Sequence, residues 1–168
     1  MRAKLLAVLL MGLAGAGARA ADEPAIPREG SGSTIAVGNA TMKVLAQVPG
    51  RAQFTWEFLG VSTSDDGKGP FHNCSVRCLG AAQLAGDAYQ SYENSCTYTR
   101  PDGDQIFGVE QATRTSPNST KGSTTFVGGT GKMAGITGSS EWVRYWVRPA
   151  AEGTLQSVTK VRGSYKLP

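Results

Sequence analysis

The sequence predicts an all-β protein in which seven or eight antiparallel strands close into an eight-stranded barrel. Two observations predict this fold. Apolar residues recur at every second position, which is the period of a half-buried strand, and no stretch shows the period of an amphipathic helix. Gly, Asn, Asp and Pro interrupt the alternation every 8–15 residues, a spacing typical of antiparallel barrels and sandwiches. Closing the sheet removes its exposed edges, and a two-sheet sandwich is the alternative.

The first twenty residues are a predicted signal peptide. Arg2 and Lys4 precede the apolar run Leu5–Ala18, and residues 18–20 read ARA, with small residues at both recognition positions of a cleavage site. Cleavage removes 3 of the 17 bases and none of the 13 acids, leaving 14 and 13. We therefore expect an exported protein, periplasmic or secreted, that contacts no membrane after cleavage and binds no nucleic acid, which requires basic clusters. An uncleaved N-terminal anchor is the alternative.

Residues 21–32 are rich in Pro, Gly and charge and predict a flexible segment ahead of a single domain over 33–168. Seven strands follow from the alternation. They are expected at Ala52–Ser62, His72–Leu79, Ala88–Thr99, Gln105–Arg114, Thr124–Val127, Ser140–Val147 and Gln156–Leu167. In the last of them Val161 and Tyr165 lie opposite charged residues, which predicts one solvated face.

A glycine-rich segment follows the fifth expected strand. Residues 127–138 read VGGTGKMAGITG, with glycines at Gly128, Gly129, Gly131, Gly135 and Gly138. The segment resembles the hairpin GGTG-x-(F/Y)-x-G-x-x-G of the allene oxide cyclase and dirigent-like barrels, with Met133 at the usual aromatic position. The resemblance implies a calycin-like barrel, commonly trimeric, that binds an apolar or phenolic small molecule or steers its cyclisation or coupling.

The same glycines also suit a tight turn at a barrel corner, where close backbone approach is needed. A dinucleotide-binding fingerprint is the alternative, but Ala134 stands at its third glycine position and no helical pattern follows. We therefore expect a hairpin and no cofactor.

The three cysteines predict one disulfide bond, because cysteines of exported proteins usually pair. Cys74 and Cys78 are four residues apart in one expected strand. That separation is about 13 Å, against the ~5.5 Å that a disulfide requires. We expect Cys78 to pair with Cys96, with Cys74 as the alternative partner. A metal site or a cysteine nucleophile that includes His72 would use the same residues, but their spacing matches no standard metal pattern, so we expect no metal.

The strand around residue 144 has two different faces. Trp142 and Arg144 share one face, and Tyr145 and Val147 share the other. We expect the aliphatic face to pack in the core and the Trp/Arg face to form a subunit interface, where Trp and Arg are enriched. The alternative is that the Trp/Arg face lines a cavity, where Arg144 binds a carboxylate.

Polar groups inside an apolar barrel are candidates for ligand contact, because an inward carboxylate can act as a general acid or base. The candidates are His72, Tyr92, Glu93, Glu110, Trp142 and Arg144. No constellation among them specifies a catalytic residue. We expect a barrel that binds a small apolar molecule. The alternatives are a cofactor-free cyclase or isomerase, which confines a reactive conformer beside one polar group, and an oligomeric structural protein with a packed core.

Overall fold

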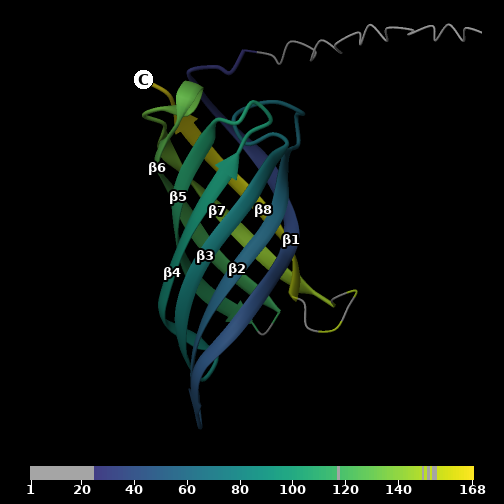
Figure 1. The fold of residues 1–168 in the computed structure, drawn as a ribbon, viewed down its shortest axis with the longest axis vertical. Helices are drawn as coiled ribbons and strands as arrows, with labels where there is room; N and C mark the ends of the chain where they lie inside the picture. Colours follow the sequence, from purple (N-terminus) through teal and green to yellow (C-terminus); the bar gives the residue numbers. More distant parts are fainter. Residues whose placement is uncertain (1–24, 117, 149, 151, 153–154) are drawn as a thin grey trace, which may run out of the picture.

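The computed structural model describes residues 25–168, except 117, 149, 151, 153 and 154. The predicted signal peptide lies outside the described residues. In the described part of the chain, eight strands form a closed antiparallel barrel in which each strand pairs with the next and β8 pairs with β1 (Figure 1). The strands are β1 (Glu29–Val48), β2 (Arg51–Ser64), β3 (Cys74–Ala85), β4 (Ala88–Thr99), β5 (Gln105–Ser116), β6 (Ser119–Gly129), β7 (Thr137–Val147) and β8 (Leu155–Lys166). The all-β class and the eight-stranded barrel are confirmed.

Strand β1 is the element that the alternation of apolar residues does not indicate. It begins at Glu29, inside the segment expected to be flexible, and pairs there with Lys166 of β8. The inward side chains of β1 are small because a large side chain on the neighbouring strand occupies the space beside them. A Cβ on Gly38 would lie 2.7 Å from Cζ of Phe58, so the Phe58 ring occupies the volume that a side chain on β1 would fill. The side chains of β1 therefore show little of the alternation between large apolar and polar residues by which a strand is recognised in a sequence.

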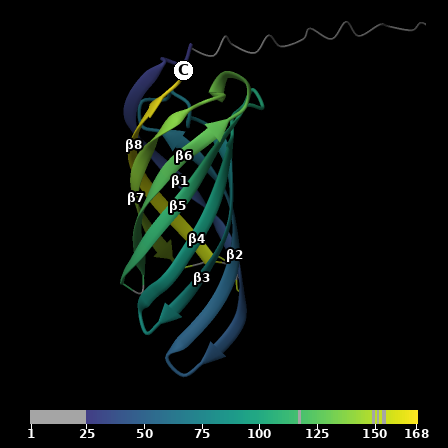
Figure 2. The same ribbon diagram turned by 90° about the vertical axis from the view of Figure 1, so that its left-hand side faces the viewer.

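At the lower end, the long hairpin between β1 and β2 projects beyond the other connections (Figures 1 and 2). The pairing of β1 with β8 ends at Ala40 and Leu155, and that of β4 with β5 ends at Asn94 and Glu110. Below these pairs, β1 to β4 continue as an open sheet. The inner face of this sheet carries a series of aromatic rings with centroids 5.1–5.7 Å apart, formed by Phe54, Trp56, Tyr92 and Tyr89.

The glycine-rich segment forms the connection between β6 and β7 at the upper end. It contains a short 3₁₀ helix, η1 (Gly131–Met133). Gly131 has φ +51°, and a Cβ there would overlap the carboxylate of Asp104, so a residue with a side chain would be strained at this position and would displace Asp104. Met133 is fully buried beside Ile106 and Ile136. The segment therefore makes the expected tight connection, and Met133 fills the upper core.

The expected disulfide is present. Cys78 and Cys96 lie directly opposite each other on β3 and β4, with their Cα atoms 4.0 Å apart and a bonded S–S distance of 2.05 Å. Cys74 keeps a buried thiol, and its Sγ donates to the carbonyl of Pro70 at 3.3 Å. The pairing of Cys78 with Cys96, rather than of Cys74 with Cys96, follows from the register of two neighbouring strands.

Candidate ligand-binding cavity

A cavity of about 520 Å³ lies inside the barrel, within the size range of small-molecule sites. Its rim is at the upper end, where exposed residues such as Ser31 line it. Its walls are mainly apolar and aromatic, formed by Phe58, Val76, Tyr98, Phe126, Trp142 and Val161. The buried polar side chains that line it are Ser62, Glu110, Thr124, Ser140, Arg144 and Thr159, and Glu110 and Thr159 both contact Arg144. The cavity therefore has an apolar body and a polar end.

Glu110 and Arg144 form a buried ion pair at this polar end. Glu110 is 3% exposed and Arg144 is 6% exposed. Oε2 of Glu110 lies 3.5 Å from Nη2 of Arg144, and it also accepts hydrogen bonds from Asn94 Nδ2 at 2.7 Å and from Tyr92 OH at 3.5 Å. The other oxygen, Oε1, accepts no hydrogen bond from any described residue, and Glu110 lines the cavity.

The guanidinium of Arg144 is held between hydrogen bonds and aromatic rings. Nε donates to Thr159 Oγ1 at 3.1 Å, and Nη1 donates to Tyr92 OH at 3.5 Å. The guanidinium carbon lies 4.8 Å from the centroid of Trp142 and 5.7 Å from that of Phe58, within the range of cation–π attraction. These contacts fix the direction in which the remaining N–H groups of Arg144 point.

Burial and the charge of Glu110 govern the ionisation of Tyr92, Tyr98 and Arg144. Burial raises the pKa of Tyr92 and of Tyr98 well above the ordinary tyrosine value, and the negative charge of Glu110 raises both further. Burial by itself disfavours the charge of Arg144, but Glu110 and Tyr92 outweigh it, and the pKa of Arg144 is raised. At neutral pH the two tyrosines are therefore neutral hydrogen-bonding groups and Arg144 is a cation.

The expectation for the strand around residue 144 is wrong. Trp142 and Arg144 point inward, while Tyr145 and Val147 are each 44% exposed. Trp142 faces Gly122 across the β6–β7 pairing, and a Cβ on Gly122 would overlap the Trp142 ring. The glycine on the neighbouring strand makes room for the indole inside the barrel. The alternative in which this face lines a cavity is the one that the structure has.

The six candidate residues divide into four that converge and two that do not. Tyr92, Glu110, Trp142 and Arg144 meet in the interior. Glu93 is exposed on the outer surface. His72 precedes β3, in the β2–β3 loop, where its Nδ1 accepts the backbone N–H of Ser64 at 3.3 Å and contacts Ser64 Oγ at 3.0 Å. His72 is absent from the residues that line the cavity.

Three residues that contact Glu110 or Arg144 were not singled out from the sequence, namely Asn94, Thr159 and Phe58. Asn94 is two residues from both Tyr92 and Cys96, so its inward direction could have been read from the alternation once Tyr92 was placed. Phe58 lies on β2, far from β7 in the chain, and nothing in the sequence indicates that it is near Arg144. Thr159 lies on β8, the next strand after β7, but only the register of that pair places it opposite Arg144.

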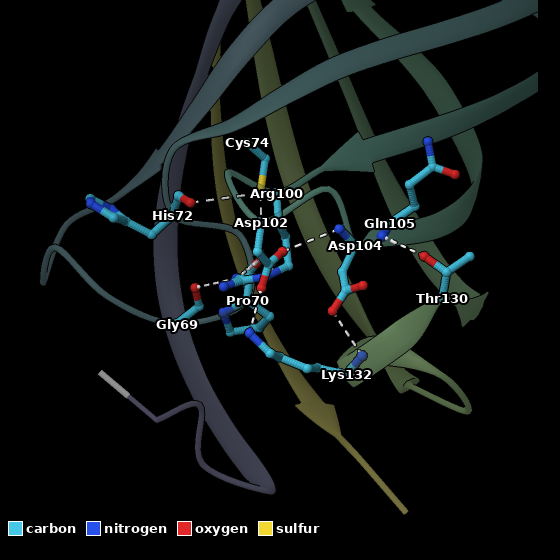
Figure 3. A network of polar contacts seen from close by, with 10 residues as sticks. All are labelled: Gly69, Pro70, His72, Cys74, Arg100, Asp102, Asp104, Gln105, Thr130 and Lys132. Carbon is cyan, nitrogen blue, oxygen red and sulfur yellow. Dashed lines mark hydrogen bonds and ion pairs between the residues drawn. The ribbon is translucent and has the colours of Figure 1, made fainter. Parts of the chain in front are cut away.

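A polar network joins three loops at the upper end (Figure 3). Nη1 of the buried Arg100 donates to the carbonyls of Gly69 at 3.2 Å and Pro70 at 3.0 Å. Nζ of Lys132 lies 2.9 Å from Asp102 Oδ2, and this contact lowers the pKa of Asp102 and raises that of Lys132. Since Gly69 and Pro70 line the cavity, the network fixes part of its rim.

One cluster in the cavity has ligand types that suit a metal. The Sγ atoms of Cys78 and Cys96 and a carboxylate oxygen of Glu110 lie within 4.8 Å of one another. Both sulfurs are joined in the disulfide, whereas a metal requires thiolates. In its disulfide form, this cluster does not provide a metal-binding set.

Comparison with known proteins returns no match: no family model, no curated protein and no solved structure is similar to this chain. The site is therefore interpreted from its own geometry. No helix in the described ranges is long and apolar enough to cross a bilayer.

Proposed function

We propose that this protein is an exported barrel that binds an apolar or phenolic small molecule in its cavity. The observation that carries the proposal is the cavity itself, about 520 Å³ of space between apolar walls with a buried polar end. Removing apolar ligand surface from water is favourable by roughly 25 cal/mol per Å², so the walls supply affinity. A few fixed polar groups then set the orientation of the ligand.

Export is supported by the disulfide between Cys78 and Cys96, because such bonds persist mainly in oxidising compartments. A periplasmic or secreted location remains part of the proposal. Membership of the allene oxide cyclase and dirigent-like barrels is also a proposal; it rests on the resemblance of residues 127–138, and the structure adds that the chain is a closed eight-stranded barrel.

A cofactor-free cyclase or isomerase is the second candidate, and one observation favours it. Glu110 lines the cavity and has an oxygen, Oε1, that receives no hydrogen bond from the described residues. A carboxylate in that position could accept a proton from a confined substrate, and confinement itself supplies orientation. A packed structural core receives less support, because the barrel interior contains a cavity of this size.

Native mass spectrometry of the protein from an exporting host tests binding. We expect an adduct of a few hundred daltons on the wild type. Ala36 and Ile35 are neighbours on β1, but Ala36 lines the cavity and Ile35 is outside it. Ala36→Phe should therefore remove the adduct, whereas Ile35→Phe should keep it. A bare wild-type mass, or an adduct that survives Ala36→Phe, would contradict binding in the cavity. The same spectra test the trimer that the resemblance to the allene oxide cyclase and dirigent-like barrels implies.

Binding and isomerisation are separated by returning the extracted compound to the protein. Recovery of the same compound supports a binding barrel. Conversion to a product of equal mass but different chromatographic retention supports an isomerase, and in that case Glu110→Gln should abolish conversion while adduct formation persists.

A further inference from the structure

We propose that the cavity selects ligands with a neutral hydrogen-bonding head group, a hydroxyl or a carbonyl, and rejects carboxylates. This inference rests on the proposed binding function and adds the chemical class of the ligand. It differs from the expectation that Arg144 binds a carboxylate, and the reason is the partner that Arg144 already has.

The charges at the polar end compensate each other. Glu110 and Arg144 are both buried and lie 3.5 Å apart. Among the described residues that line the cavity, the other charged side chains are Asp66 and Lys68, which are again of opposite sign and belong to the β2–β3 loop at the rim. The deep end of the cavity therefore offers no unpaired cation to an anionic head group.

A carboxylate that reached Arg144 would lie beside Glu110, and two anions would share one cation. Such an anion loses its hydration on entry and meets a like charge, and both effects oppose binding. An ammonium head group would lie beside the guanidinium of Arg144, and the two positive charges would repel each other. A neutral head group avoids both costs.

The polar atoms at the deep end match a neutral group that both donates and accepts. Oε1 of Glu110 can accept a hydrogen bond from a hydroxyl group. Arg144 has five N–H donors. Its Nε donates to Thr159, its Nη1 donates to Tyr92 and its Nη2 faces Glu110, which leaves a second N–H on each of Nη1 and Nη2. A hydroxyl oxygen, with a donor and two lone pairs, fits this set.

A single substitution removes the negative charge that compensates Arg144. Glu110→Gln keeps the size of the side chain and an oxygen that can accept from Asn94, but it removes the negative charge. Arg144 is then an uncompensated buried cation, and a carboxylate becomes the preferred head group. The order of affinities should therefore reverse.

The experiment is isothermal titration of the full mature protein at pH 7.5 with two matched series. One series is 1-decanol, decanoate and decylammonium; the other is 4-phenylphenol and biphenyl-4-carboxylate. In the wild type we expect the alcohol or phenol to bind at least tenfold tighter than the carboxylate of the same scaffold, and decylammonium to bind more weakly than decanol. In Glu110→Gln we expect the carboxylate to bind tighter than the alcohol or phenol of the same scaffold.

The control is Glu57→Gln, which removes a carboxylate from an exposed ion pair with Arg77 on the outer face and should keep the wild-type order. Should Glu110→Gln fail to fold, the wild type is titrated at pH 5. Decanoate, whose carboxyl has an ordinary pKa of about 4–5, should then bind at least tenfold tighter than at pH 7.5, while 1-decanol should not change.

The outcomes distinguish this inference from the proposed function. Carboxylates that bind as tightly as alcohols in the wild type would overturn the inference and leave the binding function standing. An unchanged order in a folded Glu110→Gln variant would also overturn it. Absence of binding by every compound of both series would contradict the binding function and the inference together.

Discussion

Glu110 on β5 and Arg144 on β7 meet inside the barrel, Oε2 to Nη2 at 3.5 Å, although β6 lies between their strands. In a flat sheet, side chains two strands apart lie roughly 10 Å from each other. The curvature of a closed barrel brings the inward side chains together. The ion pair therefore depends on barrel closure, and closure places both charges where water does not surround them.

This pair should show strong energetic coupling. Arg144→Met leaves the carboxylate of Glu110 buried without its cation, and we expect it to lower the free energy of unfolding by about 3–5 kcal/mol. Adding Glu110→Leu should restore part of the loss, with a coupling energy of about 1–3 kcal/mol. Urea denaturation of the four proteins of the cycle measures it. The exposed pair Glu57 and Arg77 is the control, with coupling below about 1 kcal/mol. Strict additivity at Glu110 and Arg144 would show that they do not interact.

The disulfide should stabilise the barrel measurably. Cys78 and Cys96 close a segment with a sequence separation of 18, and in the chain-entropy model a loop of this size contributes roughly 3 kcal/mol. We expect the double variant Cys78→Ala, Cys96→Ala to lose about that amount in urea denaturation. Reductant should lower the stability of the wild type and of Cys74→Ala, but not that of the double variant. Equal wild-type stability with and without reductant is the contrary result.

Two glycines on β1 should respond differently to the same substitution. A Cβ on Gly38 would lie 2.6 Å from Cα of Gly60 and 2.7 Å from Cζ of Phe58, whereas a Cβ on Gly32 meets nothing within 4 Å. We expect Gly38→Ala to destabilise by about 1–3 kcal/mol, as overpacking does, and Gly32→Ala to change stability by less than about 0.5 kcal/mol. Thermal unfolding of both variants checks this, and a similar loss in both would exclude the packing explanation.

Alkaline pH should reveal the buried tyrosines. Burial raises the pKa of Tyr92 and Tyr98 in the folded state, so above pH 10 the unfolded chain releases protons that the folded chain keeps. Stability is then fully present below pH 10 and is lost as the pH rises towards the folded values, by about 1.4 kcal/mol per pH unit for each tyrosine.

Urea denaturation between pH 9 and pH 11 measures this loss, and Tyr98→Phe should reduce it by about half. In the folded protein, absorbance at 295 nm should show fewer than the five tyrosines of the chain ionising near pH 10. A single titration of all five near pH 10 would contradict the burial of this pair.

Much of the fold could be predicted because strands have a local signature. The expected strand Ala88–Thr99 has the observed bounds of β4. Spacing and strand geometry exclude a Cys74–Cys78 bond, and the Cys78–Cys96 bond is the favoured one of the two pairings that they leave open. Strand β1 was missed because its inward positions are small, and they are small because Phe58 fills the space from the neighbouring strand. That reason lies in β2 and cannot be read from β1.

The strands, the turns and the candidate polar residues can be read from the sequence, since each depends on neighbours within about a dozen residues. The three cysteines also predict one disulfide, but the choice of Cys78 over Cys74 as the partner of Cys96 follows from the register of β3 and β4. The tertiary structure decided which face of each strand points inward, and it placed the Trp142 and Arg144 face inside against the expectation from hydrophobicity. The physical reason is that the direction of a strand is set by its partners. Gly122 on β6 leaves room for Trp142, and Glu110 on β5 compensates the charge of Arg144. Neither condition is visible in the residues of β7 alone.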